Sequence, residues 1–204
     1  MKYKLSIALA VAACLLFFSC KKENSRTPPV VDPGSGIEYF NLHDTVVHYG
    51  STPISFDFDG DGFSDLRFSV ALIGDPILKQ DIRTFRVSTG IHSKLAVSSN
   101  TEHIPMLPHG AVIPLEDFDG YQWWLVSSAI LVERIENATG QIWWQGQWKD
   151  AKNKYLPFQL IDADTLKRYT GWVELTVDIN TEKIILHRMA LSRVAEKLVR
   201  AGEL

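Results

Sequence analysis

Residues 54–70 read ISFDFDGDGFSDLRFSV, and this stretch indicates the fold class most clearly. Apolar and polar residues alternate in residues 54–58, and the alternation resumes in residues 66–70. A period of two places successive side chains on opposite faces of a β-strand. The intervening residues are mostly Asp and Gly, which favour tight turns. The stretch therefore predicts two antiparallel strands joined by an acidic loop.

The same period of two recurs through most of the chain that follows. Turn residues separate the apolar runs, for example at residues 137–140, 150–153 and 180–182. Further strands are expected at 84–87, 124–135, 141–148, 155–161, 172–179 and 183–187. Many short strands with polar turns predict an all-β fold, an antiparallel β-sandwich or jelly roll. One short C-terminal helix is expected at Ser192 to Arg200, where Val194, Ala195 and Leu198 share a face.

The N-terminus has the three parts of a secretory signal. Lys2 and Lys4 precede an apolar run from Leu5 to Phe18, and the small residue Ser19 stands directly before Cys20. The apolar run is shorter than the roughly 20 residues that a transmembrane helix needs. Residues 1–19 are therefore predicted to be a lipoprotein signal peptide, with the lipid attached to Cys20. An ordinary signal peptide, cleaved before an unmodified Cys, is the alternative.

The sequence around this cysteine resembles lipoproteins of Bacteroidota-type Gram-negative bacteria. The resemblance rests on the run Ser19-Cys20-Lys21-Lys22-Glu23, although Phe17 stands where the lipid-attachment motif usually has Leu. It implies a protein of the cell envelope, anchored by lipid to the outer membrane and either periplasmic or exposed at the surface. Stable anchoring needs more than one acyl chain, which a lipoprotein cysteine carries.

The remaining chain divides into a tether and one domain. Residues 20–36 comprise the lipidated cysteine and a Pro-, Gly- and Ser-rich segment that is expected to be flexible. Residues 37–204 have the length of a single domain. Of the two cysteines, Cys14 lies in the signal, so the mature protein has no disulfide partner for Cys20. Loss of Lys2 and Lys4 takes the net charge from −3 to −5, which argues against nucleic acid as a partner.

Residues 57–65 have the spacing of a calcium loop. Oxygen ligands are expected at the first, third, fifth, seventh and ninth positions, which are Asp57, Asp59, Asp61, the Phe63 carbonyl and Asp65. Gly62, at the sixth position, permits the sharp turn that brings the later ligands around the ion. Calcium outside the cytosol is plentiful enough for such a site to be filled even when it binds weakly.

The loop is not expected to be an EF-hand. Position twelve should be a bidentate Glu between helices, whereas here it is Phe68 and both flanks alternate as strands. The pattern DxDxDGxxD resembles the strand–loop–strand calcium sites of FG-GAP repeats in integrin-like propellers. The resemblance implies the ligand set and not the propeller fold, because the chain holds one copy. Ligands that all come from one loop between two strands favour a structural ion over a catalytic one, and a metal-free hairpin turn is the alternative.

The tryptophans suggest a ligand surface. Trp123-Trp124 and Trp143-Trp144 are adjacent pairs in expected strands, so one ring of each pair should point outward. Outward rings can stack on sugars, with Gln122, Gln145 and Gln147 supplying hydrogen bonds to hydroxyl groups. The alternative is that these rings fill the core. Trp148 and Trp172 are expected to be structural.

No catalytic motif stands out from the sequence. The strongest expectation is therefore a binding or surface-structural module, with a glycan or an envelope protein as partner. A glycan-active hydrolase that uses Glu116 and Asp119 is the alternative. A second resemblance, carried by Tyr169-Thr170-Gly171-Trp172 downstream of the acidic loop, is to secreted β-domain proteins of the same bacterial group, and it implies little about activity.

Overall fold

The computed structural model describes residues 30–31, 36–101 and 103–203. The predicted signal peptide and Cys20 lie outside these residues. Every regular element among them is a β-strand, and every strand pairing is antiparallel, which confirms the predicted all-β antiparallel class. In the same residues no helix is long and apolar enough to cross a membrane.

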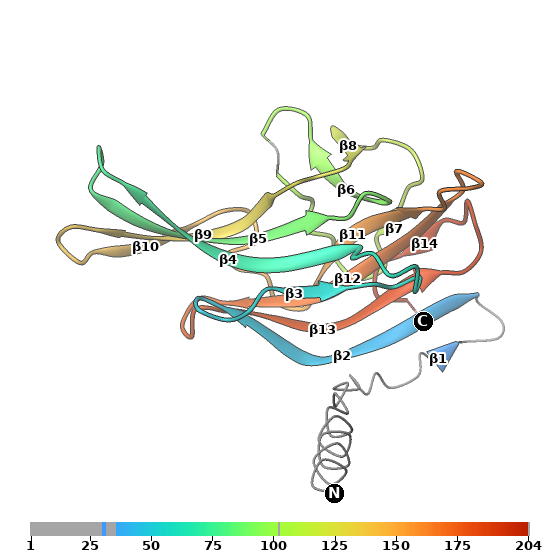
Figure 1. Cartoon of the computed structure of the whole chain (residues 1–204), viewed down its shortest axis with the longest axis horizontal. Coiled ribbons are helices and arrows are strands. Elements are labelled where there is room, and N and C mark those ends of the chain that lie inside the picture. The colour runs from blue at the N-terminus through green and yellow to red at the C-terminus, as the bar shows by residue number, and fades with distance from the viewer. Residues whose placement is uncertain (1–29, 32–35, 102, 204) are drawn as a thin grey trace, which may run out of the picture.

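Two sheets account for most of the strands (Figure 1). The seven-stranded sheet has the order β1-β2-β13-β12-β11-β6-β8, and the five-stranded sheet has the order β10-β9-β5-β4-β3. The first contains β1 (Val30–Val31), β2 (Ile37–His48), β6 (Ser93–Ser98), β8 (Tyr121–Trp124), β11 (Lys154–Ile161), β12 (Arg168–Asp178) and β13 (Lys183–Ser192). The second contains β3 (Ile54–Phe56), β4 (Leu66–Asp75), β5 (Gln80–Thr89), β9 (Ala129–Asn137) and β10 (Ile142–Gln145). A small pair joins β7 (Val112–Ile113) to β14 (Val199–Arg200).

The main core forms between these two sheets. Phe68 and Phe85 of the five-stranded sheet belong to the same buried cluster as Phe158 and Leu175 of the seven-stranded sheet. In Figure 1 the strands β4, β5 and β9 accordingly lie over β2, β13 and β12. Burial of these side chains is the main favourable contribution to folding.

A second, smaller core covers the opposite face of the seven-stranded sheet. Trp172 is fully buried there, beside Val173, which points into the main core. Tyr155 packs edge-on against Trp172, with ring centroids 5.1 Å apart. The C-terminal residues Val199 and Ala201 complete this layer. Trp148 is fully buried in the main core, so both Trp172 and Trp148 are structural, as predicted.

The predicted C-terminal helix is wrong. Ser192 is the last residue of β13, and Val199 pairs with Ile113 in an extended conformation that buries both side chains. Glu196 between them has φ of 56°, a left-handed value that an α-helix cannot contain. The apolar face of the expected helix is also not buried, because Val194 and Leu198 are 50% and 59% exposed. The pairing of β14 with β7, which covers the second core, stabilises this segment more than a local helix would.

Several boundaries differ from the expected ones. The run expected at 124–135 is divided into β8 and β9, and residues 125–128 cross from one sheet to the other. The segment expected as a flexible tether contains β1, which pairs with the start of β2. The strand expected at 141–148 ends at Gln145 as β10, and the other strands expected after residue 80 are present and longer than expected.

Gly171 is a point where the packing of the sheet admits no side chain. A Cβ added there would lie 2.5 Å from the Ala190 carbonyl oxygen and 2.5 Å from the Phe158 ring. We therefore expect Gly171→Ala to lower the free energy of unfolding by about 1–3 kcal/mol, as overpacked cores do. Gly74→Ala is the matched control, because its nearest neighbour would be 3.9 Å away. Urea denaturation of both variants measures the difference, and equal midpoints would contradict this packing.

Candidate functional site

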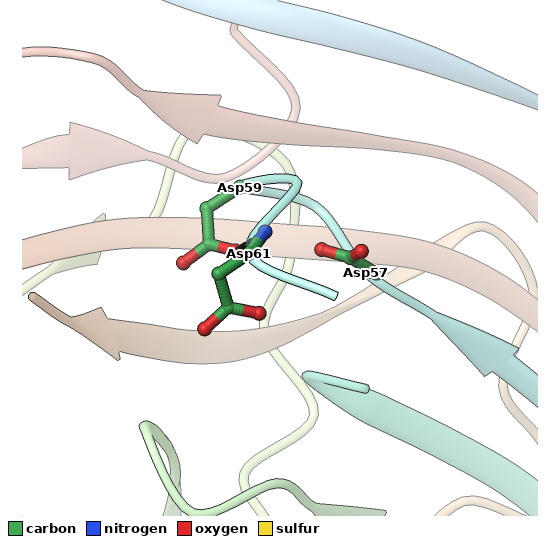
Figure 2. Close-up of side chains that lie close together, drawn as sticks. All are labelled: Asp57, Asp59 and Asp61. Carbon is green, nitrogen blue, oxygen red and sulfur yellow. Dashed lines mark hydrogen bonds between the residues drawn. The ribbon is translucent and has the colours of Figure 1, made fainter. Parts of the chain in front are cut away.

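The acidic loop joins β3 to β4, so it connects two antiparallel strands as predicted. Asp57 follows β3 directly, and Asp59 and Asp61 follow at alternate positions. One carboxylate oxygen from each of these three residues lies within 4.8 Å of the others. Figure 2 shows the three side chains on the same loop. Carboxylate oxygens gathered in this way are the ligands that calcium prefers.

Backbone hydrogen bonds hold the loop in this shape. Asp57 Oδ1 and Oδ2 accept from the Gly60 and Gly62 amides at 2.7 and 3.2 Å. Asp61 Oδ1 accepts from the Phe63 amide at 2.7 Å. Gly62 has φ of 90°, which side chains of L-residues rarely allow. Asp59 Oδ1 accepts from the Asp61 amide at 3.1 Å. The chain therefore turns sharply where the sequence predicts it, and amides of the loop itself orient all three carboxylates.

Asp65 does not join the three clustered carboxylates. It is 2% exposed, and its Oδ2 accepts from the Phe58 amide at 2.6 Å while its Oδ1 accepts from Ser93 Oγ at 3.0 Å. Its backbone amide donates to the Phe56 carbonyl, and its carbonyl accepts from the Gly90 amide. Asp65 thus ties the end of the loop to the connection between β5 and β6. Its role as a calcium ligand, like that of the Phe63 carbonyl, stays a prediction.

The electrostatics of the loop favour a cation. Burial, with the charges of Asp59 and Asp57 adding to it, raises the pKa of Asp65 to about 6. Burial also raises the pKa of Asp59, and the neighbouring charges of Asp61 and Asp57 act in the same direction. Ionised carboxylates held this close repel one another, and a bound divalent cation would remove that repulsion.

One residue beside the loop could not have been found from the local pattern. His92 lies in the β5–β6 connection, and its Nδ1 is 3.4 Å from Asp61 Oδ2. The His92 ring also packs edge-on against Phe63. Thirty-one residues separate His92 from Asp61, and only the tertiary structure brings them together.

A groove of about 730 Å³ forms the second candidate site. It is lined by residues of β6, of β8 at the edge of the seven-stranded sheet, and of β9 and β10 at the edge of the five-stranded sheet. The crossing segment 125–128 supplies further lining residues. The groove therefore lies where the chain passes between the sheets.

The groove gathers the amide side chains that the sequence singled out. Gln122, Gln145 and Gln147 all line it, together with Trp124 and Glu133. Trp124 Nε1 donates to Gln122 Oε1 at 3.1 Å, and Gln145 Nε2 donates to Glu133 Oε2 at 2.7 Å. Glu133 was missed by sequence reasoning, because a lone Glu in an alternating strand carries no signal of its own.

Trp123, Trp124, Trp143 and Trp144 differ in their burial and in what they pack against. Trp124 is 60% exposed, whereas its neighbour Trp123 is 8% exposed and belongs to the second core. Trp144 packs on the main core against Phe85, with ring centroids 5.7 Å apart. Trp143 is half-buried and is not among the groove's described lining residues. Alternation thus separates the first pair as predicted, and Trp124 alone of the four lines the groove.

The two carboxylates of the hydrolase alternative lie elsewhere. Glu116 forms an ion pair with Arg168 at 2.9 Å, and this contact lowers the pKa of Glu116. Asp119 lies in an exposed turn with φ of 47°. Neither residue lines the groove.

Comparison with known proteins identifies no relative: no family model, curated protein or solved structure matches the chain. The sites are therefore interpreted from their own chemistry.

Calcium should stabilise the protein through the three clustered carboxylates. At calcium concentrations ten to a hundred times the dissociation constant, we expect a gain of about 1.4–2.7 kcal/mol in the free energy of unfolding. Asp61→Ala should abolish this gain, because it removes a ligand from the middle of the loop. Thermal melts in calcium and in chelator measure the effect, with Asp164→Ala, an exposed turn residue, as the control. Equal melting temperatures of the unmodified protein in both conditions would refute the site.

Asp65→Ala tests whether Asp65 supports the loop through its hydrogen bonds or binds the calcium ion. This variant leaves the Phe58 amide and the Ser93 hydroxyl without their acceptor, so it should destabilise the protein by about 1–3 kcal/mol in chelator as well. A loss seen only in calcium would show that Asp65 acts as a ligand and not as a brace.

Proposed function

We propose that this protein is a lipid-anchored module of the bacterial cell envelope that binds glycans through the groove at Trp124, with a structural calcium ion in the loop at 57–65. The proposed architecture is a β-sandwich built from the two sheets. The observation that carries the binding function is the gathering of one exposed aromatic ring and three glutamine amides in a single groove. The cell-envelope location rests on the signal sequence and Cys20.

The groove has the chemistry that sugar recognition requires. An exposed indole face offers a flat apolar surface for the C–H face of a pyranose ring. Side-chain amides both donate and accept hydrogen bonds, which matches the dual character of sugar hydroxyls. The groove volume of about 730 Å³ lies in the range of small-molecule sites and has room for more than one sugar ring.

The proposed calcium ion supports the fold and takes no part in binding. Its ligands come from the loop that follows β3, which is one edge strand of the five-stranded sheet. The groove is lined by β10, the strand at the opposite edge. An ion at Asp57, Asp59 and Asp61 would offset their repulsion and hold the β3–β4 connection in place.

The groove favours binding over glycoside hydrolysis. Hydrolysis requires two carboxyl groups about 5–10 Å apart on either side of the scissile bond. Among the described residues that line the groove, Glu133 is the one carboxylate. Glu116 and Asp119 do not face it, so the hydrolase alternative has no described pair of carboxylates in this groove.

Trp124→Ala tests the binding site. We expect the variant to lose at least about tenfold in affinity for any oligosaccharide that the unmodified protein binds, because the stacking platform is gone. Isothermal titration calorimetry against a panel of neutral, basic and acidic oligosaccharides provides the measurement. Trp143→Ala is the matched control, since that indole lies outside the described lining of the groove. This variant should bind with the affinity of the unmodified protein.

Two outcomes would count against the proposal. If the panel gives no binding, the groove is not a glycan site. If Trp143→Ala loses affinity and Trp124→Ala keeps it, the sugar stacks on Trp143, which shares a face of β10 with Gln145, and the assignment of Trp124 as the stacking ring is wrong.

Cys20→Ala tests the anchor. In a Gram-negative host, the unmodified protein should incorporate labelled fatty acid and fractionate with membranes, and the variant should lose both properties because it has no thiol to acylate. Cys14→Ala is the control, since it changes a cysteine that the predicted cleavage removes. A Cys20→Ala protein that is still labelled would show that the lipid is attached at another position.

A further inference from the structure

The walls of the groove differ in their hydrogen-bonding character. On the β8 side, Gln122 Oε1 accepts from the Trp124 indole, which leaves the NH2 group of Gln122 as a donor. On the β9–β10 side, Gln145 donates one N–H of its NH2 group to Glu133, and the carbonyl oxygen of Gln145 is left as an acceptor. The β9–β10 wall is therefore rich in acceptors.

Glu133 sets the charge of that wall. It is half-buried, and only its Oε2 accepts a hydrogen bond from the described residues. No Lys or Arg is among the described residues that line the groove, and the one described histidine that lines it, His103, follows β6 and belongs to neither β9 nor β10. Arg86 lies on the same face of the sheet, but its Nε donates to Thr84 Oγ1 at 2.6 Å, and Arg86 does not line the groove. A carboxylate in a groove that no described Lys or Arg lines attracts positive charge and repels negative charge.

We propose that the groove selects basic sugars: Glu133 and Gln145 hold the protonated amine of an amino sugar while Trp124 stacks on its ring. The ammonium group offers three donors to the two available acceptors on the β9–β10 wall. A uronic acid in the same position places a carboxylate against Glu133 and is excluded. This inference rests on the proposed function, and it names the class of glycan that the same groove binds.

The test compares three oligosaccharides of equal length, which are glucosamine oligomers, their N-acetylated forms and galacturonate oligomers. At mildly acidic pH, where the amines are protonated, the glucosamine oligomer should bind about three- to tenfold more tightly than the N-acetylated form. The galacturonate oligomer should bind more weakly than both. Raising the salt concentration should reduce the preference, because the discrimination is electrostatic.

Glu133→Gln keeps the size of the side chain and removes its charge. We expect this variant to bind the glucosamine and N-acetylated oligomers with equal affinity and to gain affinity for galacturonate. Asp119→Asn is the matched control: it removes one negative charge from an exposed turn outside the groove and should keep the original order of affinities. Circular dichroism of both variants confirms that they are folded.

The outcomes separate this inference from the function on which it rests. Equal affinity of the unmodified protein for all three oligomers, or a preference for galacturonate, would overturn the charge selection and leave glycan binding intact. An unchanged order in Glu133→Gln would show that another group provides the selection. No binding of any oligomer would refute the glycan function and this inference together.

Discussion

The structure depends on one hydrophobic layer that both large sheets must share. The two sheets cover each other's inner faces, and the side chains of Phe68, Phe85 and Phe158 form part of the common cluster. The chain therefore has to pass from one sheet to the other, as it does between β2 and β3, β5 and β6, β8 and β9, and β10 and β11. These connections lie at the margins of the layer, and both candidate sites are built beside them.

Hydrogen bonds join the connections to one another. Asp65, at the end of the acidic loop, receives hydrogen bonds from Gly90 in the β5–β6 connection and from Ser93, the first residue of β6. Thr89, which ends β5, donates its amide to the carbonyl of Val126 and accepts from the amide of the same residue. Val126 belongs to the β8–β9 connection and lines the groove. A continuous set of backbone contacts thus supports both sites.

Local chemistry explains which predictions the structure bears out. Alternation places Trp123 inward and Trp124 outward, because a pleated strand turns successive side chains to opposite faces. The acidic loop joins two antiparallel strands, because Asp and Gly at these spacings close a turn with their own hydrogen bonds. The C-terminal helix fails for the opposite reason: its pattern was local, whereas burial of Val199 against Ile113 depends on a segment some 86 residues away.

By itself, the sequence determined the antiparallel all-β class, the hairpin that carries the acidic loop and the three carboxylates that converge in it. These features depend on neighbours within a few residues, and the alternation and turn residues encode them directly. Only the tertiary structure decided that Asp65 braces the loop, that His92 lies beside Asp61, and that Glu133 shares a groove with Trp124. Each of these contacts joins separate segments of the chain, and packing around the shared core brings those segments together.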